Sequence, residues 1–222
     1  MRFLECCCTN FEEAAEAEKG GAQRVELCSE LGIGGVTPPM DMVRQTINDC
    51  RRLAVNVLIR PRGGDFVYNE DEIQQMIASI KECKALGVNA VVIGALHNDG
   101  SIDRDTTKRL INEARPMEIT FHRAFDECAD PRKALEDIID LGCERLLTSG
   151  HESDAFTGRP LIADLVKQAR GRIVIMAGGG VRPHNIADIE AETSATEFHS
   201  SSHGPDGRTD RNIVKQLCNT SI

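Results

Sequence analysis

The sequence predicts a TIM barrel, a closed (β/α)8 barrel in which eight parallel strands alternate with eight helices in one domain. Short apolar segments alternate eight times with segments of helical periodicity, and neither a linker nor a change in composition interrupts the series. The length of 222 residues also suits a single barrel of this kind. An open doubly wound sheet is less favoured, because no glycine-rich phosphate fingerprint follows the first strand. Residues 1–222 are therefore expected to form one domain.

The predicted strands are mostly apolar and rich in β-branched residues, as expected for parallel strands covered on both faces. In chain order they are residues 3–8, 24–28, 54–59, 90–94, 118–122, 144–148, 173–176 and 195–199. Pro61 ends the pairing after the third strand, because proline has no N–H to donate to a sheet. Glycines at residues 20–21, 87 and 142 stop a helix just before a strand, which repeats one unit along the chain.

The helices are predicted from their start signals and their periodicity. Residues 10–13 and 69–72 each have the asparagine and glutamate spacing of a capping box. Asp130-Pro131 is a cap followed by a proline in the first turn, and Pro183 is likewise expected to open a helix. In chain order the expected helices are residues 10–19, 40–51, 69–87, 103–114, 130–142, 160–170, one beginning at 183, and 209–218.

Composition excludes several classes of function. The net charge of -9 and the pI near 5.2 argue against nucleic acid or an anionic membrane as a partner. Apolar runs are too short to span a bilayer, and the acidic start, Met-Arg-Phe-Leu-Glu, does not resemble a signal peptide. The protein is therefore expected to be cytoplasmic. Its nine cysteines are an odd number that includes three in a row, so they are interpreted as free thiols.

Residues 58–66, Leu-Ile-Arg-Pro-Arg-Gly-Gly-Asp-Phe, are predicted to be the exit of a buried strand into a loop that forms a site. Arg60 and Arg62 stay charged at physiological pH and present planar sets of donors that suit a carboxylate or a phosphate. The two glycines allow a sharp turn or a close approach to a ligand. Asp65 adds an acidic group to the same loop.

Polar residues also follow the other predicted strands, at the ends that define the functional face of a TIM barrel. The candidates collected from the strand ends are Glu5, Cys7, Glu26, Cys28, Arg60, Arg62, Asp65, His122, Arg123, Asp126, Thr148, Ser149, Gly178, Gly179, Gly180, Glu197, His199 and Ser201.

Three strands repeat one spacing, Glu5-x-Cys7, Glu26-x-Cys28 and Glu197-x-His199. Residues two apart share a face of a strand, and the eighth, first and second strands of a closed barrel are neighbours. Two thiols and an imidazole could therefore meet at one metal ion, and thiolates select soft ions such as Cu(I) or Zn(II). The alternative is that Cys7 and Cys28 fill the core, which is the usual role of a buried cysteine. A register shift of one residue in Cys6-Cys7-Cys8 would also turn the ligand into core.

Glu5, Glu26 and Glu197 lie in strands expected to be buried, so they must meet cations. Arg24, Arg60, Arg62 and Arg123 are the candidate partners. One alternative is an ion network that only stabilises the barrel. The other leaves some arginine donors free to hold an anionic ligand, with a carboxylate or His122 as general base or acid.

The glycines at 178–180 and the serines at 200–202 follow the seventh and eighth strands, where barrel enzymes commonly bind phosphate. The glycine triplet and Ser201 are therefore candidate phosphate ligands. The alternative is that the triplet is only a tight turn between a strand and a helix.

Several segments together resemble the CutC copper homeostasis family from about residue 3 to residue 212. They are Glu5-Cys6-Cys7, Gly-Ala-Gln-Arg-Val-Glu-Leu-Cys at 21–28, Gly-Gly-Val-Thr-Pro at 34–38, Ile-Arg-Pro-Arg-Gly-Gly-Asp-Phe at 59–66, Thr-Phe-His-Arg-Ala-Phe-Asp at 120–126, Leu-Thr-Ser-Gly at 147–150 and Ala-Thr-Glu-Phe-His at 195–199. The resemblance implies a cytosolic TIM barrel, usually a homo-oligomer, that takes part in copper handling. It also implies that Cys7 and Cys28 are the Cu(I) ligands.

Two functions are therefore predicted. The first is binding or trafficking of Cu(I) through Cys7 and Cys28 in a homo-oligomer, a dimer or a tetramer, with Glu5, Glu26 and Arg60 supporting the ligands. The second is an enzyme, a lyase, isomerase or hydrolase, that acts on a small anionic metabolite such as a phosphorylated one. It is favoured by the acids, bases and cations at the strand ends, which metal binding alone does not need. The sequence leaves open whether the protein is an enzyme.

Overall fold

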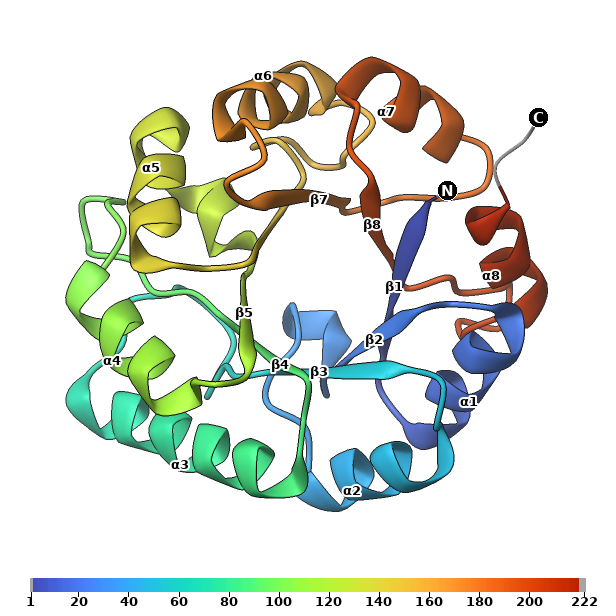
Figure 1. Ribbon diagram of the computed structural model, residues 1–222, viewed down its shortest axis with the longest axis horizontal. Coiled ribbons are helices and arrows are strands. Elements are labelled where there is room, and N and C mark those ends of the chain that lie inside the picture. The colour runs from blue at the N-terminus through green and yellow to red at the C-terminus, as the bar shows by residue number, and fades with distance from the viewer. Residues whose placement is uncertain (1, 220–222) are drawn as a thin grey trace.

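Eight parallel strands close into a barrel in which each strand pairs with the next along the chain and β8 pairs back with β1. The computed structural model describes residues 2–219 and confirms the predicted TIM barrel as one domain. The strands are β1 (Phe3–Cys8), β2 (Arg24–Leu27), β3 (Ala54–Leu58), β4 (Ala90–Ile93), β5 (Glu118–Phe121), β6 (Arg145–Thr148), β7 (Val174–Gly178) and β8 (Glu197–Ser200). Figure 1 looks along the barrel and shows these strands inside a ring of helices.

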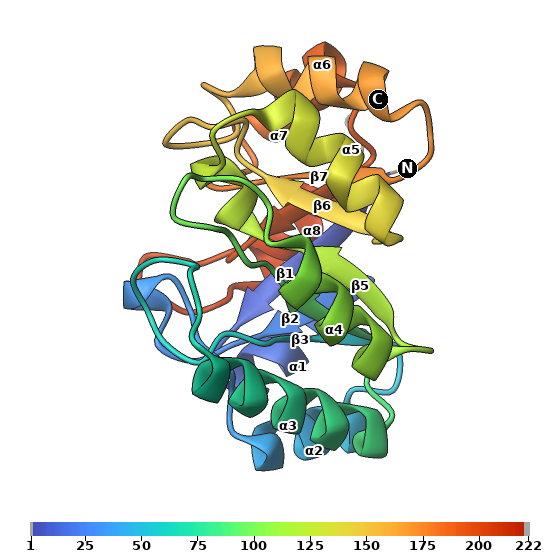
Figure 2. The ribbon, with the colours of Figure 1, turned by 90° about the vertical axis from the view of Figure 1, so that its left-hand side faces the viewer.

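One α-helix follows each strand and packs on the outside of the barrel. These helices are α1 (Phe11–Gly20), α2 (Met40–Asp49), α3 (Glu70–Leu86), α4 (Arg104–Ala114), α5 (Pro131–Leu141), α6 (Arg159–Ala169), α7 (Ile186–Thr193) and α8 (Arg211–Cys218). Two short 3-10 helices, η1 (Leu31–Ile33) and η2 (Arg123–Glu127), lie in the loops after β2 and β5. Figure 2 views the barrel from the side, and η1 lies at its left among other strand-to-helix loops. None of the helices in residues 2–219 combines the length and the apolar character needed to cross a membrane.

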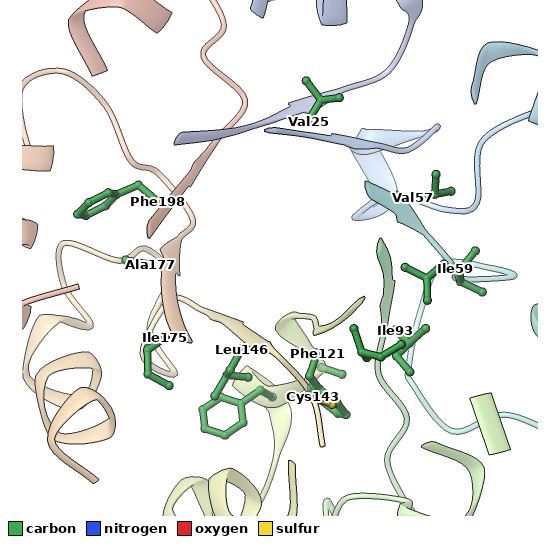
Figure 3. Packing of buried hydrophobic residues seen from close by; sticks show 14 of the residues in the cluster. Val25, Val57, Ile59, Ile93, Phe121, Cys143, Leu146, Ile175, Ala177 and Phe198 are labelled. Carbon is green, nitrogen blue, oxygen red and sulfur yellow. The ribbon is translucent and has the colours of Figure 1, made fainter. Parts of the chain in front are cut away.

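The main hydrophobic core lies between the barrel and the helices. Figure 3 shows Val25, Phe121 and Phe198 pointing away from the barrel axis toward this layer, where all three side chains are fully buried. A second, smaller cluster consists of Cys7, Cys28, Leu58 and Val92. Cys7 lies on the inward face of β1, Cys28 directly follows β2, and Leu58 and Val92 belong to β3 and β4. The cluster therefore lies inside the barrel. The alternation of strand residues thus separates an outer core from an inner site.

The structure corrects one predicted capping box and one predicted helix start. Asn10 caps α1 as expected, accepting from the Glu13 amide, but the Glu13 carboxylate accepts from the amide of Thr9 and not from that of Asn10. The box predicted at residues 10–13 is therefore incomplete, whereas the box at residues 69–72 is confirmed. Pro183 does not open a helix, since α7 begins at Ile186. The intervening turn is held by Asn185, which accepts from the Arg182 amide and donates to the Gly180 carbonyl.

Candidate functional site

A cavity of about 320 Å³ opens at the carboxyl ends of the strands, and we call it the mouth cavity. Ten of the sequence-predicted candidates line it. They are Cys7, Glu26, Cys28, Arg60, His122, Arg123, Gly179, Gly180, His199 and Ser201. The other eight do not line it. These are Glu5, Arg62, Asp65, Asp126, Thr148, Ser149, Gly178 and Glu197. The structure therefore brings most of the predicted ligand residues together at one cavity. Most of the other candidates form hydrogen bonds or ion pairs with neighbouring side chains.

Two buried thiols form the base of the mouth cavity. The Sγ atoms of Cys7 and Cys28 lie 3.5 Å apart, and the Cys7 thiol faces Glu26 Oε1 at 4.0 Å. One donor atom each from Cys7, Glu26 and His199 lies within 4.8 Å of the others. The contact with Cys28, burial and the nearby charge of Glu26 all raise the pKa of Cys7 well above its usual value. The thiol is therefore protonated at neutral pH, and a bound cation would have to displace that proton.

Below the thiols, a buried ion network crosses the barrel interior. The guanidinium of Arg24 donates to Glu5 and to Glu197, which are 0% and 9% exposed. Glu197 also accepts from Arg145 Nε at 3.1 Å, and Glu5 from the Asn56 amide at 3.1 Å. Arg24 was expected from the sequence to meet such carboxylates. Arg145 and Asn56 were missed, although the alternation within their strands places them on the inward face.

Glu5 links this network to the mouth cavity. Its Oε1 lies 2.7 Å from Nδ1 of His199, whose ring lines the cavity. Burial alone would raise the pKa of Glu5, but Arg24 and His199 outweigh it and lower that pKa to about 2. Burial alone would lower the pKa of His199, and the hydrogen bond to Glu5 reverses this and raises it. Glu5 therefore fixes the orientation of the His199 ring, as a carboxylate often does for a metal-binding histidine.

Glu26 differs from Glu5 and Glu197, because no arginine in residues 2–219 forms an ion pair with it. Its Oε2 is buried without a hydrogen-bond partner within residues 2–219. Burial is the main cause that raises the pKa of Glu26 to about 7. Glu26 is thus a carboxyl group that changes charge near neutral pH and lies beside a thiol, which suits either a metal ligand or a proton acceptor.

A Glu26→Gln variant is expected to be more stable than the parent at pH 8 and equally stable at pH 4. The folded-state pKa of about 7 exceeds the ordinary value of 4.5, so the parent loses stability as pH rises from about 4.5 through 7. Glutamine has no charge to bury, and the expected gain is on the order of 3 kcal/mol. Denaturant unfolding of metal-free protein at both pH values measures it. A variant less stable than the parent at pH 8 would contradict this account of Glu26.

The arginines predicted to neutralise the glutamates have other partners. Arg62 pairs with Glu72 and Asp65 and holds the loop after β3 together, away from the mouth cavity. Arg123 pairs with Asp126 at 2.8 Å and donates to Ser149 Oγ at 2.8 Å. Asp126 also accepts from the backbone amide of Ser149. The predicted pairing of Arg60, Arg62 and Arg123 with the strand carboxylates is therefore wrong.

The loops after β7 and β8 form the opposite wall of the mouth cavity. Gly179 and Gly180 have φ values of 94° and 69°, a conformation that favours glycine. Arg182 follows them and donates to Ser200 Oγ at 3.1 Å and to Ser201 Oγ at 3.2 Å. Within residues 2–219 no carboxylate lies within 4 Å of its guanidinium. Arg182 was not predicted as a site residue, although it stands two positions after a glycine triplet that was.

A parallel barrel that gathers thiols, a carboxyl group, an imidazole and arginines at one mouth is a TIM-barrel protein with a candidate site for a small ligand or a metal ion. The CutC family model matches residues 2–204, so the chain belongs to the CutC family.

Individual relatives agree with this assignment. A CutC family protein of Parabacteroides distasonis is 52% identical over 200 residues, which cover 90% of this chain and 82% of the relative. The human copper homeostasis protein cutC homolog is 45% identical over 220 residues, covering 99% of this chain and 78% of the human protein.

Solved structures show the same fold. The crystal structure of CutC from Streptococcus agalactiae matches with a TM-score of 0.87 and 32% identity, covering 90% of this chain and 99% of that one. An aldolase, QR15, matches with a TM-score of 0.73 at 16% identity, covering 96% and 93%, and shares the fold alone.

Proposed function

We propose that the protein binds Cu(I) as its cargo in copper homeostasis, with Cys7 and Cys28 as ligands and Glu26 and His199 beside them. The observation that carries this proposal is the 3.5 Å contact between the two thiols inside the barrel. Cu(I) is a soft ion that prefers such ligands. The names of the relatives, copper homeostasis proteins among them, support copper as the metal.

The donor set fits a soft cation. The three donor atoms of Cys7, Glu26 and His199 are close enough to bind one ion, and Glu26 Oε2 has no hydrogen-bond partner within residues 2–219 that would compete for it. Glu5 orients His199, and Arg24 neutralises Glu5. A bound monovalent cation would take the place of the thiol protons and ease the burial of thiolate charge.

The cytosol is the proposed location, because all nine cysteines are free thiols and eight of them are buried, which is typical of a reducing compartment. The family resemblance also supports a homo-oligomer, either a dimer or a tetramer. Light scattering would measure the mass of this oligomer.

An anaerobic Cu(I) titration against a competing chelator tests the proposal. We expect one tight equivalent per chain and a rise in melting temperature as that equivalent binds. X-ray absorption should show two sulfur ligands. Weak binding of several equivalents without a thermal shift would mean that the cysteines bind Cu(I) adventitiously.

A second candidate function is favoured by Arg182. Its guanidinium lines the mouth cavity beside two serine hydroxyls and has no acidic partner among the described residues, so it can hold an anion. An enzyme of the lyase, isomerase or hydrolase type that acts on a small anionic metabolite would use such an anchor. The phosphate-binding role of Gly179, Gly180 and Ser201 belongs to this proposal. Gly178 ends β7, and a Cβ there would lie 2.4 Å from Leu147 Cδ1, so it acts through packing.

If the second candidate is correct, inorganic phosphate should raise the melting temperature of the parent, and Arg182→Gln should weaken phosphate binding about tenfold. Without the Arg182 charge, only the hydroxyls of Ser200 and Ser201 remain at this position, and two neutral hydroxyls bind a phosphate ion weakly. Calorimetric titration measures the affinity, and Arg44→Gln, at an exposed arginine on α2, is the matched control. Equal affinities of the Arg182→Gln variant and the parent would remove Arg182 as the anchor.

A further inference from the structure

His122 presents a fixed hydrogen-bond donor to the mouth cavity. The residue precedes η2, and its Nδ1 accepts from the Ala124 backbone amide at 3.1 Å. A nitrogen that accepts this bond carries no proton, so in the neutral ring the proton is on Nε2. Nε2 is buried without a partner within residues 2–219, and the ring, 5% exposed, lines the mouth cavity. One buried N–H is therefore left for a ligand.

Arg60 brings a buried positive charge to the same wall. Its terminal nitrogens donate only to backbone carbonyls, those of Ile33, Gly35 and Gly64. Its Nε is buried without a partner, and among the described residues no carboxylate lies within 4 Å of the guanidinium. A buried cation that donates only to carbonyls has no carboxylate in direct contact among the described residues. An anion that enters the cavity would supply that contact.

Phe66 connects the two donors. The guanidinium of Arg60 lies 4.7 Å from the centre of the Phe66 ring, and that ring lies 5.0 Å from the centre of the His122 ring. Gly94 makes room for this arrangement, since a Cβ there would lie 2.6 Å from two atoms of the imidazole. The donors are thus held by packing among segments that follow β3, β4 and β5, before any ligand binds.

We propose that this wall of the mouth cavity binds a small carboxylate, whose oxygens accept from Nε2–H of His122 and from Nε–H of Arg60. Two N–H groups and one positive charge match a carboxylate group, and the Phe66 ring offers an apolar surface to the carbon next to it. The inference rests on the second candidate function and deepens it, because it names the class of ligand. It does not depend on copper binding.

The same geometry determines what His122 contributes to a reaction. Burial, together with the charge of Arg60, lowers the pKa of His122 to about 3. The ring is neutral at physiological pH, and its one lone-pair nitrogen already accepts from Ala124. His122 therefore holds its proton at Nε2 and stabilises negative charge on a ligand oxygen by donating a hydrogen bond. This role differs from the general base or acid that the sequence suggested for it.

The test uses metal-free, reduced protein and four carboxylates, namely glycolate, pyruvate, malonate and succinate, each with its amide as a control. We expect at least one carboxylate to bind saturably, with its amide about tenfold weaker. His122→Asn keeps a side-chain oxygen for the Ala124 amide but is too short to place an N–H where Nε2–H lies, and Arg60→Lys keeps the charge and loses Nε–H. Each should weaken binding about tenfold, whereas His97→Asn, at an exposed histidine, should not.

Nitrogen NMR of labelled histidine provides a readout that needs no variant. Nε2 of His122 should be protonated in the free protein and should shift when the carboxylate binds. The test uses metal-free protein, so a failure of the copper proposal would leave this one standing. An unprotonated Nε2, an affinity unchanged by both His122→Asn and Arg60→Lys, or binding of inorganic phosphate alone would overturn the inference.

Discussion

Replacing Cys7 and Cys28 together by serine is expected to abolish the tight Cu(I) equivalent of the parent. The two thiols are 4% and 1% exposed and face each other in the inner cluster, so no other pair of soft ligands replaces them there. Serine oxygens are hard ligands that Cu(I) binds poorly. The loss of affinity should exceed the roughly 100-fold effect of changing groups that only support metal ligands. Chelator competition under anaerobic conditions measures the loss.

Cysteines of the outer core provide the matched control. Cys50 and Cys83 are also buried, but both lie in the outer core that packs against the helices. A Cys50→Ser, Cys83→Ser variant removes as many thiols and should keep the tight equivalent. If both double variants lose Cu(I) to the same extent, or neither does, the inner thiol pair is not the site.

The period of two residues in a strand and the repeated Glu-x-Cys spacing predict Cys7 as the inward thiol, but they do not fix the register of Cys6-Cys7-Cys8. The structure places Cys7 in the inner cluster, whereas Cys6 and Cys8 belong to the outer core. The predicted barrel rested on the same regularity, repeated through eight strand and helix units, and on glycines that end helices. These are local signals, and local signals sufficed for the fold.

The partners of the charged residues could not be predicted in the same way. The sequence places Arg60, Arg62 and Arg123 after strands of the same barrel as the buried glutamates. In the structure each of them instead donates hydrogen bonds to groups on its own loop or on an adjacent loop. A long flexible side chain can reach several acceptors, and loop geometry has no periodicity that selects one of them. Arg145 is a different case. It lies on the inward face of β6, and applying the alternation to every strand would have found it.

Arg24→Met is expected to destabilise the folded protein by about 3–5 kcal/mol at pH 7, the usual cost of removing one partner from a buried ion pair. Glu5 and Glu197 would remain in the barrel interior with Arg145, at the edge of the network, as the remaining arginine. Denaturant unfolding measures the change. Arg52→Met is the control, because Arg52 is 75% exposed and its pair with Glu18 contributes little.

The pH dependence of this variant separates charge from packing. In the parent, Glu5 has a pKa of about 2, below its ordinary 4.5, so its contribution to stability is complete above pH 4.5 and is lost as pH falls toward 2. Without Arg24 the part of that contribution that Arg24 supplies is absent at every pH, and only the part from His199 remains. The difference in unfolding free energy between the parent and the Arg24→Met variant should therefore become smaller as pH falls from 4.5. A constant difference would show that Arg24 stabilises by packing, for instance against Phe3, whose ring centre lies 4.6 Å away.

Cu(I) affinity of the folded Arg24→Met variant then distinguishes the two interpretations of the network. Arg24 lowers the pKa of Glu5, and Glu5 in turn orients His199. If the network only stabilises the barrel, the folded variant binds Cu(I) as tightly as the parent. If it also positions a ligand, affinity falls by about 10- to 100-fold while both thiols remain in place. The proposed site requires the second result, because His199 has no other partner in the described residues that would keep its ring toward the thiols.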